Sequence, residues 1–177
     1  MSRKRKHNMG YSLVELVVVI AIMVVLAGAG ISMTGLIPRN QVRKCAKNII
    51  TLVEKTRTEA MSFQDARLTI YRTGYGVYAD MYVKKQGAES LVSTTLLGDE
   101  GIQVEFDLDD GSHFALGSGS EEVEKLTLRF DRSSGSFQNS ILEPDKGIVA
   151  TCSAIRISKG SAESILKLVK LTGKIGY

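Results

Sequence analysis

The sequence has no tryptophan, two histidines and two cysteines, and its cysteines and histidines show no zinc-site spacing. His113 is the one histidine after residue 10, and no motif of an activated nucleophile accompanies it. We therefore interpret His113 as a surface residue beside a turn. We expect a protein that is not an enzyme and has no cofactor.

A metal-binding loop is also missing. The segment from Asp107 to Gly111 superficially resembles a calcium loop, but its glycine falls at the fifth position and no glutamate follows where an EF-hand needs one. A plain hairpin turn is the favoured interpretation, and no metal site is predicted.

An excess of positive charge is present only at the start of the chain. Four of the 23 basic residues lie at positions 3–6, and none of the 19 acidic residues precedes Tyr11. A chain cut before Tyr11 would carry equal numbers of each and a net charge of zero, which does not support nucleic-acid binding. The basic leader fits the positive-inside rule for a segment kept in the cytoplasm.

Charge is absent from residues 16–31, an apolar run that Glu15 immediately precedes. A carboxylate in hydrocarbon costs roughly 2.5–3.5 kcal/mol, so such residues are usually paired and functional. Cleavage after Gly10 would give Tyr11 a new ammonium group. Glu15 could pair with this group on a neighbouring subunit.

Gly10, the following Tyr-Ser-Leu-Val-Glu-Leu and the apolar run resemble the N-terminus of type IV pilins and type II secretion pseudopilins. The resemblance implies prepilin peptidase cleavage between Gly10 and Tyr11, N-methylation of Tyr11, and Glu15 as the assembly glutamate. It implies a single-pass inner-membrane protein with its N-terminus inside and its globular domain outside, later part of a cell-surface or periplasmic filament. The implied partners are other pilin or pseudopilin subunits, the peptidase, an inner-membrane assembly platform and, before assembly, membrane lipid.

This interpretation divides the chain into four segments. Residues 1–10 are a cytoplasmic leader, and residues 11–37 form a transmembrane assembly helix of roughly 40 Å. Residues 38–65 continue as an amphipathic helix, and residues 66–177 form a β-rich headgroup. Pro38 predicts a kink or break near residues 35–38.

The amphipathic helix has an apolar stripe at steps of three and four residues. The stripe consists of Val42, Cys45, Ala46, Ile49, Leu52, Val53, Thr56, Ala60 and Phe63. Runs rich in strand-forming residues follow it. They lie at residues 67–72, 76–84, 90–97, 102–108, 125–131, 148–158 and 164–171. The expected fold is α+β, with a long N-terminal helix packed on antiparallel sheet.

A second resemblance lies near the C-terminus. Phe130, Gly135 and Phe137, followed later by Thr172-Gly173-Lys174-Ile175, are similar to the two hairpins of H-type pseudopilins and related minor pilins. The spacing from Phe130 to Gly135 is one residue longer than the commoner pattern. This resemblance favours a minor subunit.

Two alternatives stay open. A bridge between Cys45 and Cys152 would close a loop of roughly 100 residues and add up to about 4.7 kcal/mol, but two free buried thiols are equally ordinary. Residues 3–29 also fit a secretory signal with a small-residue cleavage site at Ala27-Gly28-Ala29, which would release a β-rich binding domain. Glu15 within the apolar region argues against the signal.

Overall fold

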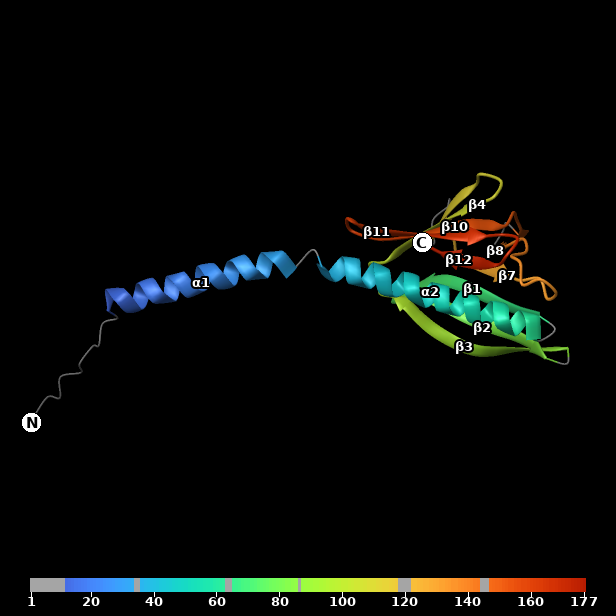
Figure 1. Cartoon of the computed structure of the whole chain (residues 1–177), viewed down its shortest axis with the longest axis horizontal. Coiled ribbons are helices and arrows are strands. Elements are labelled where there is room, and N and C mark those ends of the chain that lie inside the picture. The colour runs from blue at the N-terminus through green and yellow to red at the C-terminus, as the bar shows by residue number, and fades with distance from the viewer. Residues whose placement is uncertain (1–11, 34–35, 63–64, 86, 118–121, 144–146) are drawn as a thin grey trace, which may run out of the picture. The chain divides into compact units, whose positions relative to one another are not determined.

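The computed structural model describes residues 12–33, 36–62, 65–85, 87–117, 122–143 and 147–177. The chain divides into two compact units, Met1–Ile37 and Pro38–Tyr177 (Figure 1).

The first unit contains helix α1, Leu13–Met33. Ser12 caps it: the Ser12 carbonyl accepts from the Leu16 N–H at 3.1 Å, and the Ser12 hydroxyl accepts from the Glu15 N–H at 3.2 Å. Serine is a preferred N-cap because its oxygen satisfies an otherwise unpaired N–H of the first turn. Among the described residues, no helix reaches the combined length and hydropathy required of a membrane span.

Helix α2, Leu36–Ser62, begins close after α1, and residues 34–35 lie outside the described residues. Pro38 lies in the first turn of α2, where the missing N–H removes no helical hydrogen bond. Pro38 is accommodated within the first turn of the second helix, and the predicted kink or break near residues 35–38 falls partly on residue 35, outside the described residues. The helix ends at Ser62, earlier than the predicted residue 65, and Asp65 already begins a strand.

The predicted stripe of α2 is confirmed where the structure describes it. Its members are buried from Val42 to Ala60, while Phe63 lies outside the described residues. Arg43, Lys44 and Lys47 are exposed.

Two six-stranded sheets make up the rest of the second unit. The first has the order β3-β2-β1-β7-β8-β9, formed by Ala88–Gly98, Gly76–Lys85, Asp65–Thr73, Lys125–Arg129, Ile141–Glu143 and Gly147–Ile148. The second has the order β12-β11-β10-β4-β5-β6, formed by Lys174–Gly176, Ala162–Val169, Cys152–Lys159, Gln103–Leu108, His113–Leu116 and Glu122–Val123. Every pairing is antiparallel except the short one between β5 and β6.

The helix stripe and the inward-facing residues of both sheets form one core cluster, and Figure 1 shows α2 running along the sheets. Ile49 of α2, Leu68 of β1 and Phe106 of β4 are all fully buried in it. The chain is therefore α+β with an N-terminal helix and antiparallel sheets. The main prediction errors are omissions of the short strands β5, β6, β8 and β12, and the predicted run at residues 148–158 joins the end of β9 to β10.

Candidate assembly site

The N-terminal motif presents Glu15 in the first turn of α1, while Gly10 and Tyr11 lie outside the described residues. An acidic side chain is favourable there because the helix N-terminus carries a partial positive charge. The Glu15 carboxylate makes no hydrogen bond or ion pair with any described residue. It is left available to a group from outside this part of the chain.

Ser12 is a functional position that the sequence analysis overlooked. Ser12 and Glu15 are spaced as in a capping box, and the structure forms the half of that motif in which the Glu15 N–H donates to the serine. The spacing was visible in the sequence, and it fixes Glu15 in the first helical turn.

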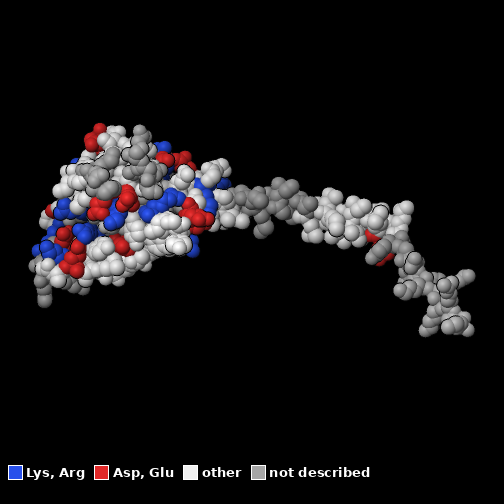
Figure 2. All heavy atoms as spheres, turned by 180° about the vertical axis from the view of Figure 1, so that it is seen from behind, with Lys and Arg blue, Asp and Glu red and all other residues white. Residues whose placement is uncertain are grey.

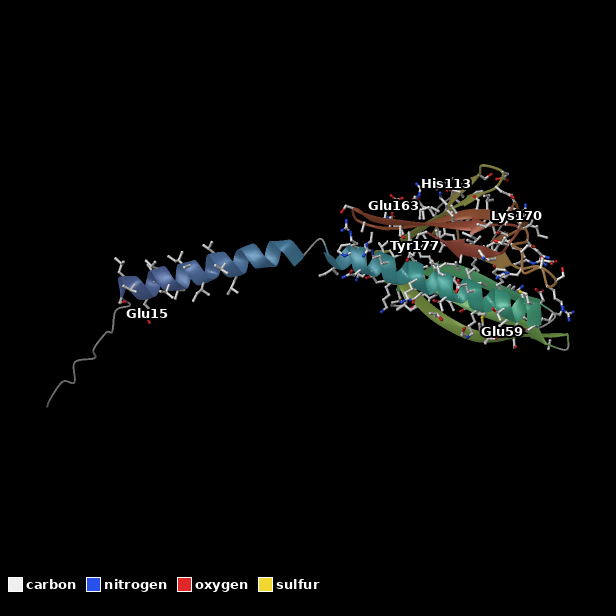
Figure 3. The ribbon with its side chains drawn as sticks, viewed as in Figure 1. Glu15, Glu59, His113, Glu163, Lys170 and Tyr177 are labelled. Atoms are coloured by element: carbon white, nitrogen blue, oxygen red, sulfur yellow. The ribbon has the colours of Figure 1, made fainter. Side chains whose placement is uncertain are left out.

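The rest of the described α1 surface is apolar on all sides. Its large side chains are between 46% exposed, at Val19, and 79% exposed, at Leu13. Figure 3 shows side chains projecting around the helix, and Figure 2 shows no lysine or arginine on its described part. A continuous exposed apolar surface of this kind marks an interaction site.

The two hairpins of the C-terminal resemblance meet in the second unit. Phe130 and Phe137 form an isolated β-bridge, with ring centroids 5.0 Å apart. The Phe137 N–H donates to the Lys170 carbonyl at 2.9 Å, which ties this loop to the final hairpin. Segments far apart in sequence thus share one corner of the fold.

Arg57 of α2 joins the same corner. Its Nε donates to the Gly135 carbonyl at 2.9 Å. Gly173 packs so closely that a Cβ there would overlap this carbonyl and lie 2.8 Å from Arg57 Nε. Both glycines have positive φ angles, 66° and 62°. This close contact explains why glycine is needed in both turns.

Asp131 organises the loop that contains Gly135. Its Oδ1 accepts from the Ser133 hydroxyl at 2.6 Å, the Ser134 hydroxyl at 2.8 Å and the Ser134 N–H at 2.9 Å. These hydrogen bonds, those of the Ser133 and Ser134 side chains first, lower the pKa of Asp131 to about 2.

The segment from Asp107 to Gly111 ends strand β4 and makes the predicted turn, with the Gly111 N–H donating to the Leu108 carbonyl at 3.1 Å. His113 is exposed, as predicted, but it lies between two carboxylates. Its Nδ1 is 2.6 Å from Asp107 Oδ1, and its Nε2 is 3.6 Å from Glu105 Oε2. The described residues contain no group of histidine, cysteine or acidic side chains arranged to hold a metal.

Cys45 and Cys152 are both buried and free, so the bridge considered from sequence is not formed. Cys152 pairs with Leu108 at the end of β4. Cys45 lies one helical turn after Gln41. The Gln41 side-chain amide donates to the Asp99 carboxylate at 3.1 Å, and Asp99 precedes the start of β4. Cys45 thus lies near Asp99, whereas Cys152 lies beside Leu108. Burial, then the charge of Asp99, raises the pKa of Cys45 to about 12, and burial also raises that of Cys152.

Residues 5–31 match the family model of the prokaryotic N-terminal methylation motif. The match supports the type IV pilin-like family. It covers the N-terminal motif alone, and comparisons with curated proteins and solved structures give no significant match. The motif indicates a structural rather than catalytic protein that prepilin peptidase processes. It is typical of proteins that are membrane-anchored and then assembled into filaments.

Proposed function

We propose that the protein is a minor structural subunit of a type IV pilus or a type II secretion pseudopilus. Prepilin peptidase cleaves it between Gly10 and Tyr11, Tyr11 is N-methylated, and residues 11–37 hold it in the inner membrane before assembly. Its globular unit lies outside the cytoplasm, and an inner-membrane platform transfers it into a filament of similar subunits.

The observation that carries this proposal is the exposed apolar surface of α1 beside Glu15, whose carboxylate has no partner among the described residues. Large apolar side chains of α1 are exposed, and in this proposal lipid or other subunits supply their environment. Within a filament, the Glu15 carboxylate pairs with the Tyr11 ammonium of a neighbour. That pair offsets a desolvation cost that either charge alone would leave uncompensated.

The minor-subunit assignment draws its support from the second unit. The Phe130–Phe137 bridge and the close contact of Gly135 with Gly173 combine the two hairpins of the H-type resemblance in one corner. Arg57 ties that corner to α2. The arrangement fits a headgroup built directly on the continuation of an assembly helix.

Processing at Gly10 is the experiment that tests the proposal. Gly10→Val should leave an uncleaved precursor, because the peptidase must accommodate a very small side chain beside the scissile bond. The matched control is Ala29→Val, which disrupts the cleavage site of the alternative secretory signal. Mass spectrometry of the mature chain should find methylated Tyr11 at its start in the unmodified protein and in the control. A mature chain that begins at Gly30 would instead establish a secreted domain.

A further inference from the structure

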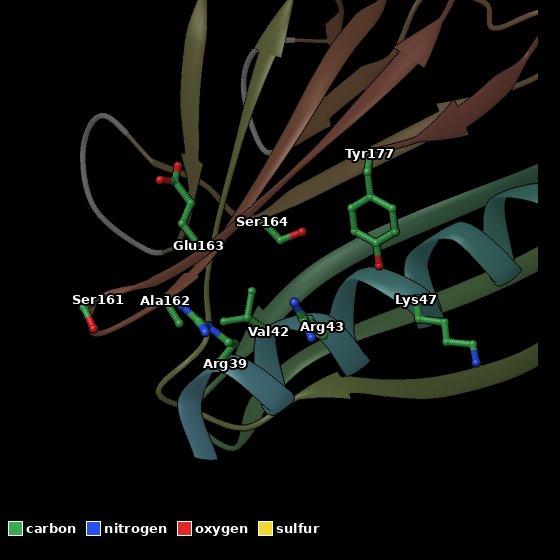
Figure 4. A pocket seen from close by; sticks show the side chains of 9 residues that line it. All are labelled: Arg39, Val42, Arg43, Lys47, Ser161, Ala162, Glu163, Ser164 and Tyr177. Atoms are coloured by element: carbon green, nitrogen blue, oxygen red, sulfur yellow. The ribbon is translucent and has the colours of Figure 1, made fainter. Parts of the chain in front are cut away.

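The second unit carries an open groove of about 890 Å³ between the first turns of α2 and strand β11 (Figure 4). Arg39, Arg43 and Lys47 line it from the helix, while Ser161 and Ser164 line it from the hairpin that contains β11. Tyr177 lines it as well, and Figure 4 shows its phenol pointing toward α2.

The three cations of the groove are uncompensated. The side chains of Arg39, Arg43 and Lys47 make no hydrogen bond or ion pair with the described residues, although the Lys47 backbone carbonyl accepts from Thr51 Oγ1 at 3.0 Å. Glu163 also lines the groove, but its carboxylate is 3.2 Å from Arg156 Nε in an ion pair of its own. The lining therefore offers positive charge and hydroxyl donors without an internal partner.

This donor set suits a phosphate group. Guanidinium groups bind phosphate oxygens through paired N–H donors, and lysine adds a compact positive charge. Serine and tyrosine hydroxyls supply further hydrogen bonds. The volume is that of a site for an organic headgroup, larger than one inorganic ion requires.

The position of the groove along the chain limits where that phosphate comes from. Arg39 follows Met33, the last residue of α1, by six residues, which span at most about 20 Å even when fully extended. If residues 11–37 are in the membrane, as proposed above, the groove stays close to the bilayer surface. Basic residues near such a surface are attracted to anionic lipids.

We propose that this groove binds the phosphate headgroup of an anionic phospholipid at the outer surface of the inner membrane before assembly. The inference rests on the membrane anchoring of the proposed function. The bound lipid holds the globular unit against the bilayer, and entry into the filament requires its release.

The absence of tryptophan makes a clean test available. Tyr177→Trp places a single fluorescent reporter in the groove. It keeps an aromatic ring there and replaces the phenol O–H donor with an indole N–H donor. The full chain is reconstituted into phosphatidylcholine vesicles that contain a dansyl-labelled lipid and increasing phosphatidylglycerol. Energy transfer from the reporter should rise with the phosphatidylglycerol content.

In this reporter background, Arg39→Gln/Arg43→Gln/Lys47→Gln should abolish the rise. Each basic residue strengthens binding to an anionic surface about fivefold, so three together weaken it about a hundredfold. The matched control, Lys44→Gln/Lys55→Gln/Lys167→Gln, removes the same charge from exposed residues outside the groove and should keep the rise. Circular dichroism of both variants verifies folding.

Three results would overturn the proposal: transfer independent of phosphatidylglycerol, equal loss in both triple variants, or transfer governed by protein density in the bilayer. The last result would assign the groove to a second copy of the chain.

Alkaline carbonate extraction separates this test from that of the proposed function. A chain released from the vesicles would disprove anchoring, whereas a retained chain without lipid dependence would disprove the groove alone.

Discussion

The two helices of this chain have comparable lengths, 21 residues in α1 and 27 in α2, but opposite relations to the rest of the molecule. The described side chains of α1 are all exposed, whereas one face of α2 is buried under both sheets. An apolar stripe needs a partner on one side, and a helix apolar on all sides needs partners all round. Helix α2 is completed by its own chain, and under the proposed function lipid or other subunits complete α1.

The largest expected effect separates assembly from folding. Glu15→Ala and Glu15→Gln should be inserted and processed but enter filaments poorly, because the Tyr11 ammonium of a neighbour loses its partner in an apolar core. Glu15→Asp should recover little, since its side chain is one methylene shorter. Immunoblots of sheared filament fractions, compared with membrane fractions, measure the distribution.

Thermal unfolding of the second unit is the control for these variants. Glu15 belongs to the first compact unit, so the melting temperature of the second unit should not change in these variants. Normal assembly of Glu15→Ala would show that another contact sets the register between subunits. A position at the filament tip, with fewer neighbours, is the expected exception.

A second pair of substitutions compares the helices directly. Ile49→Ala in α2 removes a fully buried side chain and should lower the free energy of unfolding by about 2–5 kcal/mol. Leu16→Ala in α1 alters a side chain that is 58% exposed and should change the unfolding of the second unit by less than about 0.5 kcal/mol. Urea titrations of the detergent-solubilised full chain give both values. Similar losses would mean that α1 also stabilises the globular unit.

A third comparison tests the close contact at Arg57 of α2. Gly173→Ala places a Cβ against the Gly135 carbonyl at a positive φ angle and should cost about 2–5 kcal/mol. Gly160→Ala is the matched control, because Gly160 has a similar φ of 58° but open space around it. It should cost only the backbone strain, about 1–2 kcal/mol. Equal costs in urea titrations would show that the turn, and not the contact, requires glycine.

The buried face of α2 was predictable because helical periodicity depends on local sequence spacing. The longer strands were predictable for the same reason. Strands β8 and β12, three residues each, were missed because so short a segment shows no clear alternation, although their partners β7, β9 and β11 lie close in sequence.

The candidate site likewise contains features that the sequence predicts and features that it does not. The position of Glu15 in an apolar context was readable locally, and the Ser12 cap could have been read from its spacing to Glu15. The contact of Arg57 with Gly135 joins residues 78 positions apart, and no local pattern reports it. The sequence left open a bridge between Cys45 and Cys152 or two free buried thiols, and the structure has the free thiols. Sequence places both residues in apolar patterns, but does not show that Cys45 lies near Asp99 and Cys152 beside Leu108.

The smallest expected effect concerns the Asp131 loop, which presents Gly135 to Arg57 of α2. The pKa of Asp131 is lowered from 3.8 to about 2, so its carboxylate stabilises the fold above about pH 4 and loses this contribution as the pH falls toward 2. Asp131→Asn should therefore be less stable than the unmodified chain at pH 7, and the difference should vanish near pH 2. Ser134→Ala removes one donor and should raise the pKa of Asp131, followed by NMR titration of its carboxyl carbon. Because Asp131 lies in the second compact unit and α1 in the first, filament entry of both variants should follow their folded fraction alone. A stability difference that persists unchanged at pH 2 would show that Asp131 acts through its shape and not its charge.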